Sequence, residues 1–123
     1  MIFIDTSALV GSFAGERPSG ERLVAFLREG QEFAMSSLVL YEWLRGPRTA
    51  QELLQQEKVL PADQAIPFGA EEAARAADVY RRVSRARTRE VDIAIAATAI
   101  VRGAPLWTLN PEDFRDIPDL KLV

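Results

Sequence analysis

The sequence contains neither cysteine nor histidine among its 123 residues. The absence of cysteine excludes disulfide bonds, thiolate zinc sites and cysteine nucleophiles. The absence of histidine excludes a Ser-His-Asp triad, a histidine general base and metal sites built on imidazole. Any hydrolytic chemistry must therefore use carboxylates, hydroxyl groups, lysine or a metal ion held by oxygen ligands.

Long apolar runs are also absent. No run approaches the ~18–20 residues that a membrane-spanning helix needs, and no secretory signal is visible at the start of the sequence. Hydrophobic residues nevertheless make up 48% of the chain, which is enough to build one core. We therefore expect a single domain over residues 1–123, no membrane association and a cytoplasmic location.

Basic residues are outnumbered by acidic ones, and the net charge of −3 argues against a general nucleic-acid binder. Lys58 and Lys121 are the only lysines, so nearly all of the basic residues are arginines. Five of these lie close together in the sequence: Arg81, Arg82, Arg85, Arg87 and Arg89. This cluster is suited to contact RNA phosphates or an acidic segment of a partner protein. It is equally typical of a solvated helix face, and both interpretations stay open.

Short apolar runs alternate with helical patterns along the chain. Strands are predicted at residues 2–4, 33–35 and 106–109, with an edge strand at 120–123. Helices are predicted to begin at Ala8, with Thr6 or Ser7 as the N-cap, and at Asn110, with Pro111 at the first helical position. The remaining helices are predicted near residues 18–30, 37–45, 52–56, 69–83 and 91–101. This alternation predicts an α/β fold with a parallel sheet.

Carboxylates occupy informative positions in this pattern. Asp5 directly follows the first strand, and ligands of open parallel sheets bind beyond the carboxyl ends of strands. Asp92 is a lone carboxylate in an otherwise almost apolar helix, where burial costs several kcal/mol unless a cation or partner compensates it. Glu42 lies in the helix after the second strand, and Asn110 and Asp113 follow the third. Each also has a structural interpretation as a helix cap, a first-turn acid or a surface residue.

Taken together, these acids are expected at the same end of one sheet. Mutual repulsion would raise their pKa values unless a divalent cation lay among them. Oxygen ligands suit Mg²⁺ or Mn²⁺. Hydrolysis of a phosphodiester is the reaction that fits such a site best in a chain without histidine, cysteine or a glycine-rich phosphate loop.

Four segments in order resemble the motifs of PIN domains, in particular the VapC-like toxins of bacterial toxin–antitoxin pairs. These are residues 2–10 (IFIDTSALV), 41–46 (YEWLRG), 92–97 (DIAIAA) and 108–114 (TLNPEDF). The resemblance covers essentially the whole chain. It implies a three-layer α/β/α fold around a central parallel sheet and an endoribonuclease that depends on Mg²⁺ or Mn²⁺.

The resemblance also assigns residues. Asp5, Glu42 and Asp92 match the core acids of the family, and Asp113 matches a fourth acid that varies more among relatives. The polar residues that support the site are matched by Thr6, Ser7 and Asn110. In some relatives an acid stands at the position of Asn110, which is a neutral ligand here, so the role of fourth ligand falls more on Asp113.

A mechanism and partners follow from the same resemblance. Asp5 and Asp92 are expected to bind the metal, while Glu42 and Asp113 complete its shell or orient a water that attacks phosphorus and leaves a 5′ phosphate. The expected partners are an RNA substrate, a cognate antitoxin that covers the active site and a second copy of the chain in a homodimer. Two alternatives remain, a structure-directed DNA nuclease and a non-catalytic binding module with the PIN fold.

Overall fold

A short parallel sheet lies at the centre of the computed structural model, which describes residues 1–15 and 17–123. Its strands are β1 (Ile2–Ile4), β2 (Phe33–Ala34) and β3 (Leu106–Trp107), in the order β2-β1-β3. All residues of β1 and β3 are buried. A parallel sheet with helices on both faces accounts for these uniformly apolar strands.

The helices follow the predicted order along the chain. They are α1 (Thr6–Phe13), α2 (Arg17–Arg28), α3 (Ser37–Arg45), α4 (Ala50–Val59), α5 (Ala70–Arg82) and α6 (Glu90–Val101), together with the short 3₁₀ turns η1 (Ala62–Gln64), η2 (Ala86–Thr88) and η3 (Pro111–Asp113).

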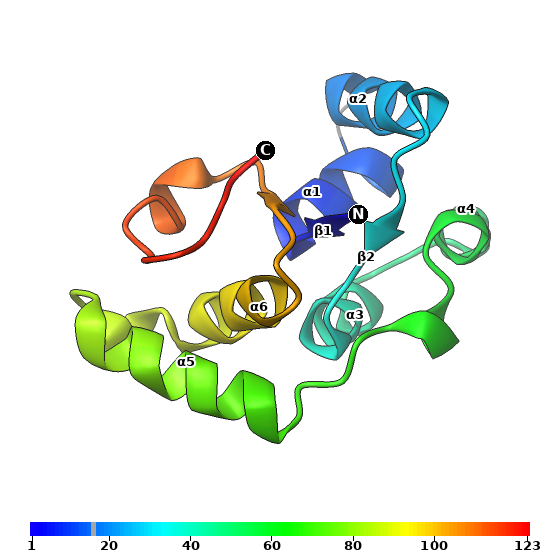
Figure 1. Ribbon diagram of the computed structural model, residues 1–123. Coiled ribbons are helices and arrows are strands. Elements are labelled where there is room, and N and C mark those ends of the chain that lie inside the picture. The colour runs from blue at the N-terminus through cyan, green and yellow to red at the C-terminus, as the bar shows by residue number, and fades with distance from the viewer. Residues whose placement is uncertain (16) are drawn as a thin grey trace.

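Helices cover both faces of the sheet. The register pairs Ile4 with Trp107, and the ring of Phe26 on α2 lies edge-on to Phe33 and Trp107, at centroid distances of 5.9 and 5.4 Å. Because α2 packs on these strand side chains, it covers that face of the sheet. Figure 1 places α3 and α6 on the opposite side of β1 from α2, with α5 packed outside α6. The predicted three-layer α/β/α fold is confirmed.

The start of α1 differs from the prediction. The helix begins at Thr6 rather than at Ala8, and its N-cap is Asp5, not Thr6 or Ser7. Asp5 has an extended backbone, and its Oδ1 accepts a hydrogen bond from Ala8 N at 2.9 Å. Aspartate is among the strongest N-cap residues, so this carboxylate caps a helix while it also lies at the end of β1.

The prediction of a helix at Asn110 was wrong. The segment forms only the single turn η3, and the Asn110 side chain makes no capping hydrogen bond. The chain bends away at this point, and Phe114 and Ile117 both reach the core with exposed fractions of 2% and 4%. Burial of these two side chains therefore takes the place of a longer helix.

The other strand and helix limits differ by a few residues. The predicted strands 33–35 and 106–109 are shorter, and the predicted edge strand 120–123 forms only one bridge, between Leu106 and Leu122. Helix α4 is longer than predicted because Thr49 and Glu52 form a reciprocal capping box at its start. Within the described ranges, no helix is long and apolar enough to cross a lipid bilayer.

Candidate active site

The carboxylate of Asp5 is held by three donors at the end of β1. Its Oδ1 accepts hydrogen bonds from Ser7 Oγ at 2.7 Å and from Ala8 N at 2.9 Å, and its Oδ2 accepts one from Thr108 Oγ1 at 2.6 Å. Asp5 is only 4% exposed. Burial raises the pKa of Asp5, and these hydrogen bonds oppose the rise, with Thr108 the strongest of them. The carboxylate is thus fixed in one orientation.

The two hydroxyls that bind Asp5 are themselves oriented by the backbone. Ser7 Oγ accepts a hydrogen bond from Leu109 N, and Thr108 Oγ1 accepts one from Asn110 N, each at 3.0 Å. Because each hydroxyl accepts from an amide, its own proton is directed at Asp5. The sequence analysis missed Thr108. Its position carried a signal, because it follows Trp107 as Asp5 follows Ile4, and these two strand residues are paired.

Glu42 reaches the same region from α3. Its side chain is 19% exposed, and its Oε1 accepts a hydrogen bond of 2.5 Å from Thr6 Oγ1. Thr6 adjoins Asp5 in sequence, so this bond ties Glu42 to the Asp5 end of the sheet. Arg45 lies 3.4 Å from the other oxygen, Oε2, at the exposed edge. The predicted supporting residues Thr6 and Ser7 therefore each hold one of the acids.

Asp92 completes the group from the first turn of α6. Burial and the repulsion of Asp113, Asp5 and Glu42 raise the pKa of Asp92 to about 6, and the nearby Arg89 guanidinium opposes this. Each of the three acids is therefore near enough to act on Asp92 electrostatically. Asp5 follows β1, and the other three acids lie on α3, α6 and η3, so four acids that are distant in the sequence influence one another in the fold.

The donor set suits a hydrated Mg²⁺ or Mn²⁺ ion. All of the donors are oxygen atoms, and the raised pKa of Asp92 reflects negative charge that a cation would neutralise. Among residues 1–15 and 17–123, no three carboxylates are close enough to hold an ion directly. Mg²⁺ usually keeps several waters and binds one or two carboxylates, so an ion here would contact at most two of the acids directly and the others only through water.

The model of the PIN domain family matches residues 2–120 of the chain. The chain belongs to the PIN-domain family. It is 36% identical to "Ribonuclease VapC19" of Mycobacterium tuberculosis over 124 residues, which is 98% of each protein. A shorter match, 43% identical over 60 residues, is to "Ribonuclease VapC" of Rickettsia bellii and spans 47% of this chain and 45% of the relative. The likeness places the chain with the VapC-like PIN domains.

Solved structures show the same fold. VapBC2 from Rickettsia felis, bound to a DNA fragment from its promoter, gives a TM-score of 0.75 at 23% identity and covers 100% of this chain and 98% of that one. A toxin–antitoxin complex from Klebsiella pneumoniae gives a TM-score of 0.76 at 24% identity, with coverage of 98% and 95%.

The fourth acid of this PIN domain shares a cavity with Asp92. Asp113 is exposed and lines a polar cavity of about 390 Å³ together with Asp92, Arg85 and Arg89. Asn110 is exposed and is not among the residues that line this cavity. Asp113, and not Asn110, therefore borders the same cavity as Asp92.

Two of the five clustered arginines form ion pairs away from the carboxylates. Arg81 and Arg82 lie 3.8 and 3.1 Å from Asp78 on the same helix, and Arg82 is also 4.0 Å from Asp119. Their side chains are 69% and 50% exposed. For these two residues, the structure matches the interpretation as a solvated helix face.

The other three arginines lie beside Asp92. Arg85 lines the polar cavity, and Arg87 lines a shallower neighbouring pocket that Asp92 also borders. Arg85 also has a left-handed backbone, with φ 51° and ψ 35°, which is uncommon for a residue other than glycine. Arg89 binds Asp116. The cluster thus divides into an ion-paired part on α5 and a part next to the acids.

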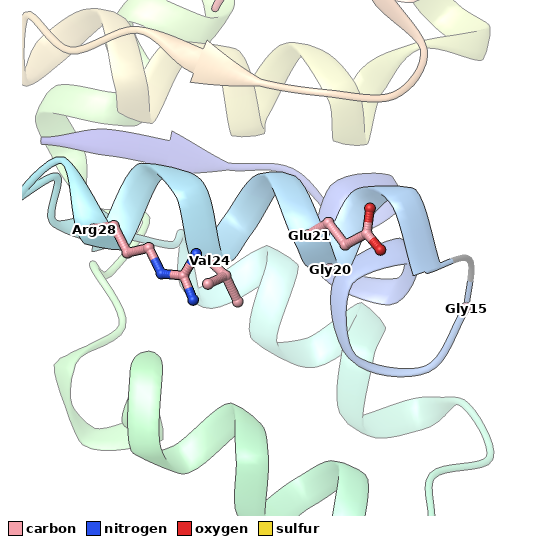
Figure 2. A pocket seen from close by; sticks show the side chains of 5 residues that line it. All are labelled: Gly15, Gly20, Glu21, Val24 and Arg28. Atoms are coloured by element: carbon pink, nitrogen blue, oxygen red, sulfur yellow. The ribbon is translucent and has the colours of Figure 1, made fainter.

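A separate pocket of this PIN domain lies along α2 (Figure 2). It has a volume of about 610 Å³ and is lined by Gly15, Gly20, Glu21, Val24 and Arg28. Figure 2 shows Val24 and Arg28 extending from the same side of the helix. None of the four clustered acids lines this pocket, so it is not part of the carboxylate site.

Proposed function

We propose that this PIN domain is a metal-dependent endoribonuclease and the toxin of a toxin–antitoxin pair. The observation that carries the proposal is the convergence of four carboxylates on one end of the sheet, where three of them raise the pKa of the fourth. RNA as the substrate is supported by the identity of 36% to a protein named a ribonuclease.

Asp5 and Asp92 are the residues we assign to Mg²⁺ or Mn²⁺, with Glu42 and Asp113 completing the shell or orienting water. When bound, the ion supplies positive charge that neutralises the phosphate and lowers the pKa of a water. Its affinity for the site depends on ionised carboxylates, so the hydrogen bonds to the Asp5 carboxylate, which oppose the rise in its pKa, also favour binding.

The chain's own residues divide the remaining work. Thr6 binds Oε1 of Glu42 at 2.5 Å, whereas Oε2 has the exposed Arg45 at the longer distance of 3.4 Å. Oε2 is therefore the oxygen we assign to the attacking water, whose proton it accepts. The water oxygen bonds to phosphorus as the bond from phosphorus to the 3′ oxygen breaks, and the leaving oxygen takes a proton from solvent water, which leaves a 5′ phosphate and a 3′ hydroxyl. Asp113 is exposed and borders the same polar cavity as Arg85, so we assign that cavity to the RNA phosphate.

An antitoxin is the expected protein partner. Two of the solved structures with this fold are a VapBC assembly and a toxin–antitoxin complex, which supports an antitoxin as the partner. A homodimer stays a prediction of the resemblance, and a cytoplasmic location stays a prediction from the sequence.

The test is cleavage of end-labelled RNA by the purified chain, with a DNA of the same sequence beside it. We expect cleavage of RNA that EDTA abolishes and Mg²⁺ or Mn²⁺ restores. Asp5→Asn and Asp92→Asn should abolish cleavage while circular dichroism stays unchanged, and Asp63→Asn, at an exposed acid on η1, is the matched control.

Other outcomes would contradict the proposal. Near-normal activity of either site variant would remove these residues from the mechanism. Preferential cleavage of DNA would favour the DNA nuclease. An absence of any metal-dependent cleavage would favour a non-catalytic binding module.

A further inference from the structure

Arg89 is the most densely hydrogen-bonded arginine beside the acids. Its Nη1 donates to Asp116 Oδ2 at 2.9 Å and to the Ser84 carbonyl at 3.0 Å. Its Nη2 donates to Asp116 Oδ1 at 2.6 Å and to the Asp113 carbonyl at 2.9 Å. The side chain is 17% exposed, and both of its terminal nitrogens are engaged.

The partners of Arg89 come from segments far apart in the sequence. Ser84 lies in the turn after α5, whereas Asp113 and Asp116 lie in and after η3. Arg89 itself is the N-cap of α6 and precedes Asp92 by three residues. One side chain therefore joins the helix that carries Asp92 to the loop that carries Asp113.

The turn that carries Asp113 does little by itself to fix the position of this residue. Asp92 and Asp113 repel each other, and η3 is a single turn without a side-chain cap. Within the described part of the chain, the Asp113 side chain forms no ion pair within 4.0 Å. A bidentate arginine–carboxylate pair supplies both strength and a fixed orientation, which a lysine cannot reproduce.

We propose that Arg89 is a positioning residue, which fixes the loop that carries Asp113 against the helix that carries Asp92, so that both carboxylates are available to the divalent ion. The inference rests on the proposed function. It also separates Arg89 from the arginines expected to contact RNA, because four of its five N–H groups are committed within the protein.

The experiment measures Mn²⁺ binding directly, by isothermal titration calorimetry and electron paramagnetic resonance, in Arg89→Lys and Asp116→Asn. We expect both variants to bind Mn²⁺ about tenfold or more weakly, in the range found when groups behind metal ligands are changed. The Mg²⁺ concentration for half-maximal cleavage should rise equally, while the KM for RNA at saturating Mg²⁺ stays near the wild-type value.

A double-mutant cycle tests whether Arg89 and Asp116 act together on the binding of Mn²⁺. The combined Arg89→Lys/Asp116→Asn variant should bind Mn²⁺ no more weakly than the worse single variant, because both changes disrupt the same Arg89–Asp116 pair. Matched controls are Arg75→Lys and Asp78→Asn, which alter two exposed ion pairs of α5, that of Arg75 with Asp119 and that of Arg82 with Asp78. Both should keep wild-type affinity.

Each result has a distinct meaning. Unchanged Mn²⁺ affinity with a raised KM for RNA would overturn the inference and make Arg89 an RNA contact. Unchanged Mn²⁺ affinity and KM would overturn it as well. If Arg89→Lys fails to fold, the Mn²⁺ affinity of Asp116→Asn alone tests the inference, because that variant leaves the guanidinium of Arg89 in place. A wild-type chain that binds no Mn²⁺ would instead overturn the proposed function itself.

Discussion

Burial and neighbouring carboxylates act in the same direction on Asp92, whose pKa of about 6 in the fold exceeds its ordinary value of 3.8. A carboxyl group with a raised pKa in the folded state favours folding when it is protonated. Its contribution is therefore fully present below the ordinary value and is lost as the pH rises through about 6. In metal-free protein, the ionised Asp92 destabilises the fold.

Asp92→Asn should remove the destabilisation that the ionised Asp92 causes in metal-free protein. We expect the metal-free variant to be more stable than the wild type by about 1–3 kcal/mol near neutral pH, and the difference should shrink as the pH falls below the pKa of Asp92. Urea unfolding in EDTA over a pH series measures it. A variant less stable than the wild type at neutral pH would show that Asp92 is compensated within the protein.

The hydroxyl of Thr108 lowers the pKa of Asp5 through one hydrogen bond. Thr108→Val keeps the side-chain shape but removes the strongest hydrogen bond to the Asp5 carboxylate. The pKa of Asp5 should then rise further, and cleavage should fall by about 10- to 100-fold, with the acidic limb of the pH–rate profile at higher pH.

Thr98→Val is the control for this change. Thr98 is equally buried, but its hydroxyl donates to the Ala94 carbonyl within α6. It should therefore change stability without changing the pH profile. An unchanged profile in Thr108→Val would show that the hydroxyl has no influence on Asp5.

Sequence reasoning was most successful where one residue was chemically out of place. Asp5 ends an apolar strand and Asp92 interrupts an apolar helix, so each was visible alone. Thr108 was not, because a threonine after a strand is unremarkable until the register places it beside Asp5. The role of Arg89 was equally hidden, since its partners lie in segments whose approach no local pattern encodes.

At the scale of elements, helices were predicted better than strands. Helix limits depend on nearby caps, such as Ser36 at α3, and on amphipathic spacing, which the sequence states directly. The ends of the short strands are set by contacts between segments that are distant in the sequence. After β3, the hydrogen bond from Asn110 N to Thr108 Oγ1 replaces the sheet ladder, and neither the strand end nor the short η3 could be read locally.

A buried glutamine joins two elements that the sequence analysis treated separately. Gln56 on α4 is 1% exposed, accepts a hydrogen bond from Trp43 Nε1 at 3.2 Å and donates one to the Leu60 carbonyl at 2.7 Å. It therefore links α3, which carries Glu42, to the end of α4.

Gln56→Leu should weaken this link strongly. It leaves an indole N–H and a carbonyl buried without partners, so we expect the free energy of unfolding to fall by about 2–4 kcal/mol. Urea denaturation measures the loss, and Gln51→Leu, on the exposed side of the same helix, serves as the control. A loss no larger than that of the control would mean that water replaces the glutamine.

At the scale of the whole molecule, the distribution of charge matters more than the net value of −3. The ion-paired arginines on α5 and the arginines beside Asp92 should therefore differ in their effect on RNA. Arg85→Glu or Arg87→Glu should weaken RNA binding clearly, and Arg82→Glu only slightly, because phosphate contacts act locally.

The readout is RNA affinity over a salt series, with binding to the antitoxin scored separately. An Arg85→Glu variant that loses only antitoxin binding would assign this part of the cluster to the protein partner. Equal effects of all three changes would indicate general repulsion rather than a contact.

The order of the strands in the sheet has a consequence for when the protein can fold during its synthesis. The central strand β1 precedes its neighbour β3 and the last acid, Asp113, by most of the sequence. A chain that stalls before residue 106 should lack Asp113 and leave the core unfilled. The four acids can therefore assemble only after β3 and η3 have been synthesised.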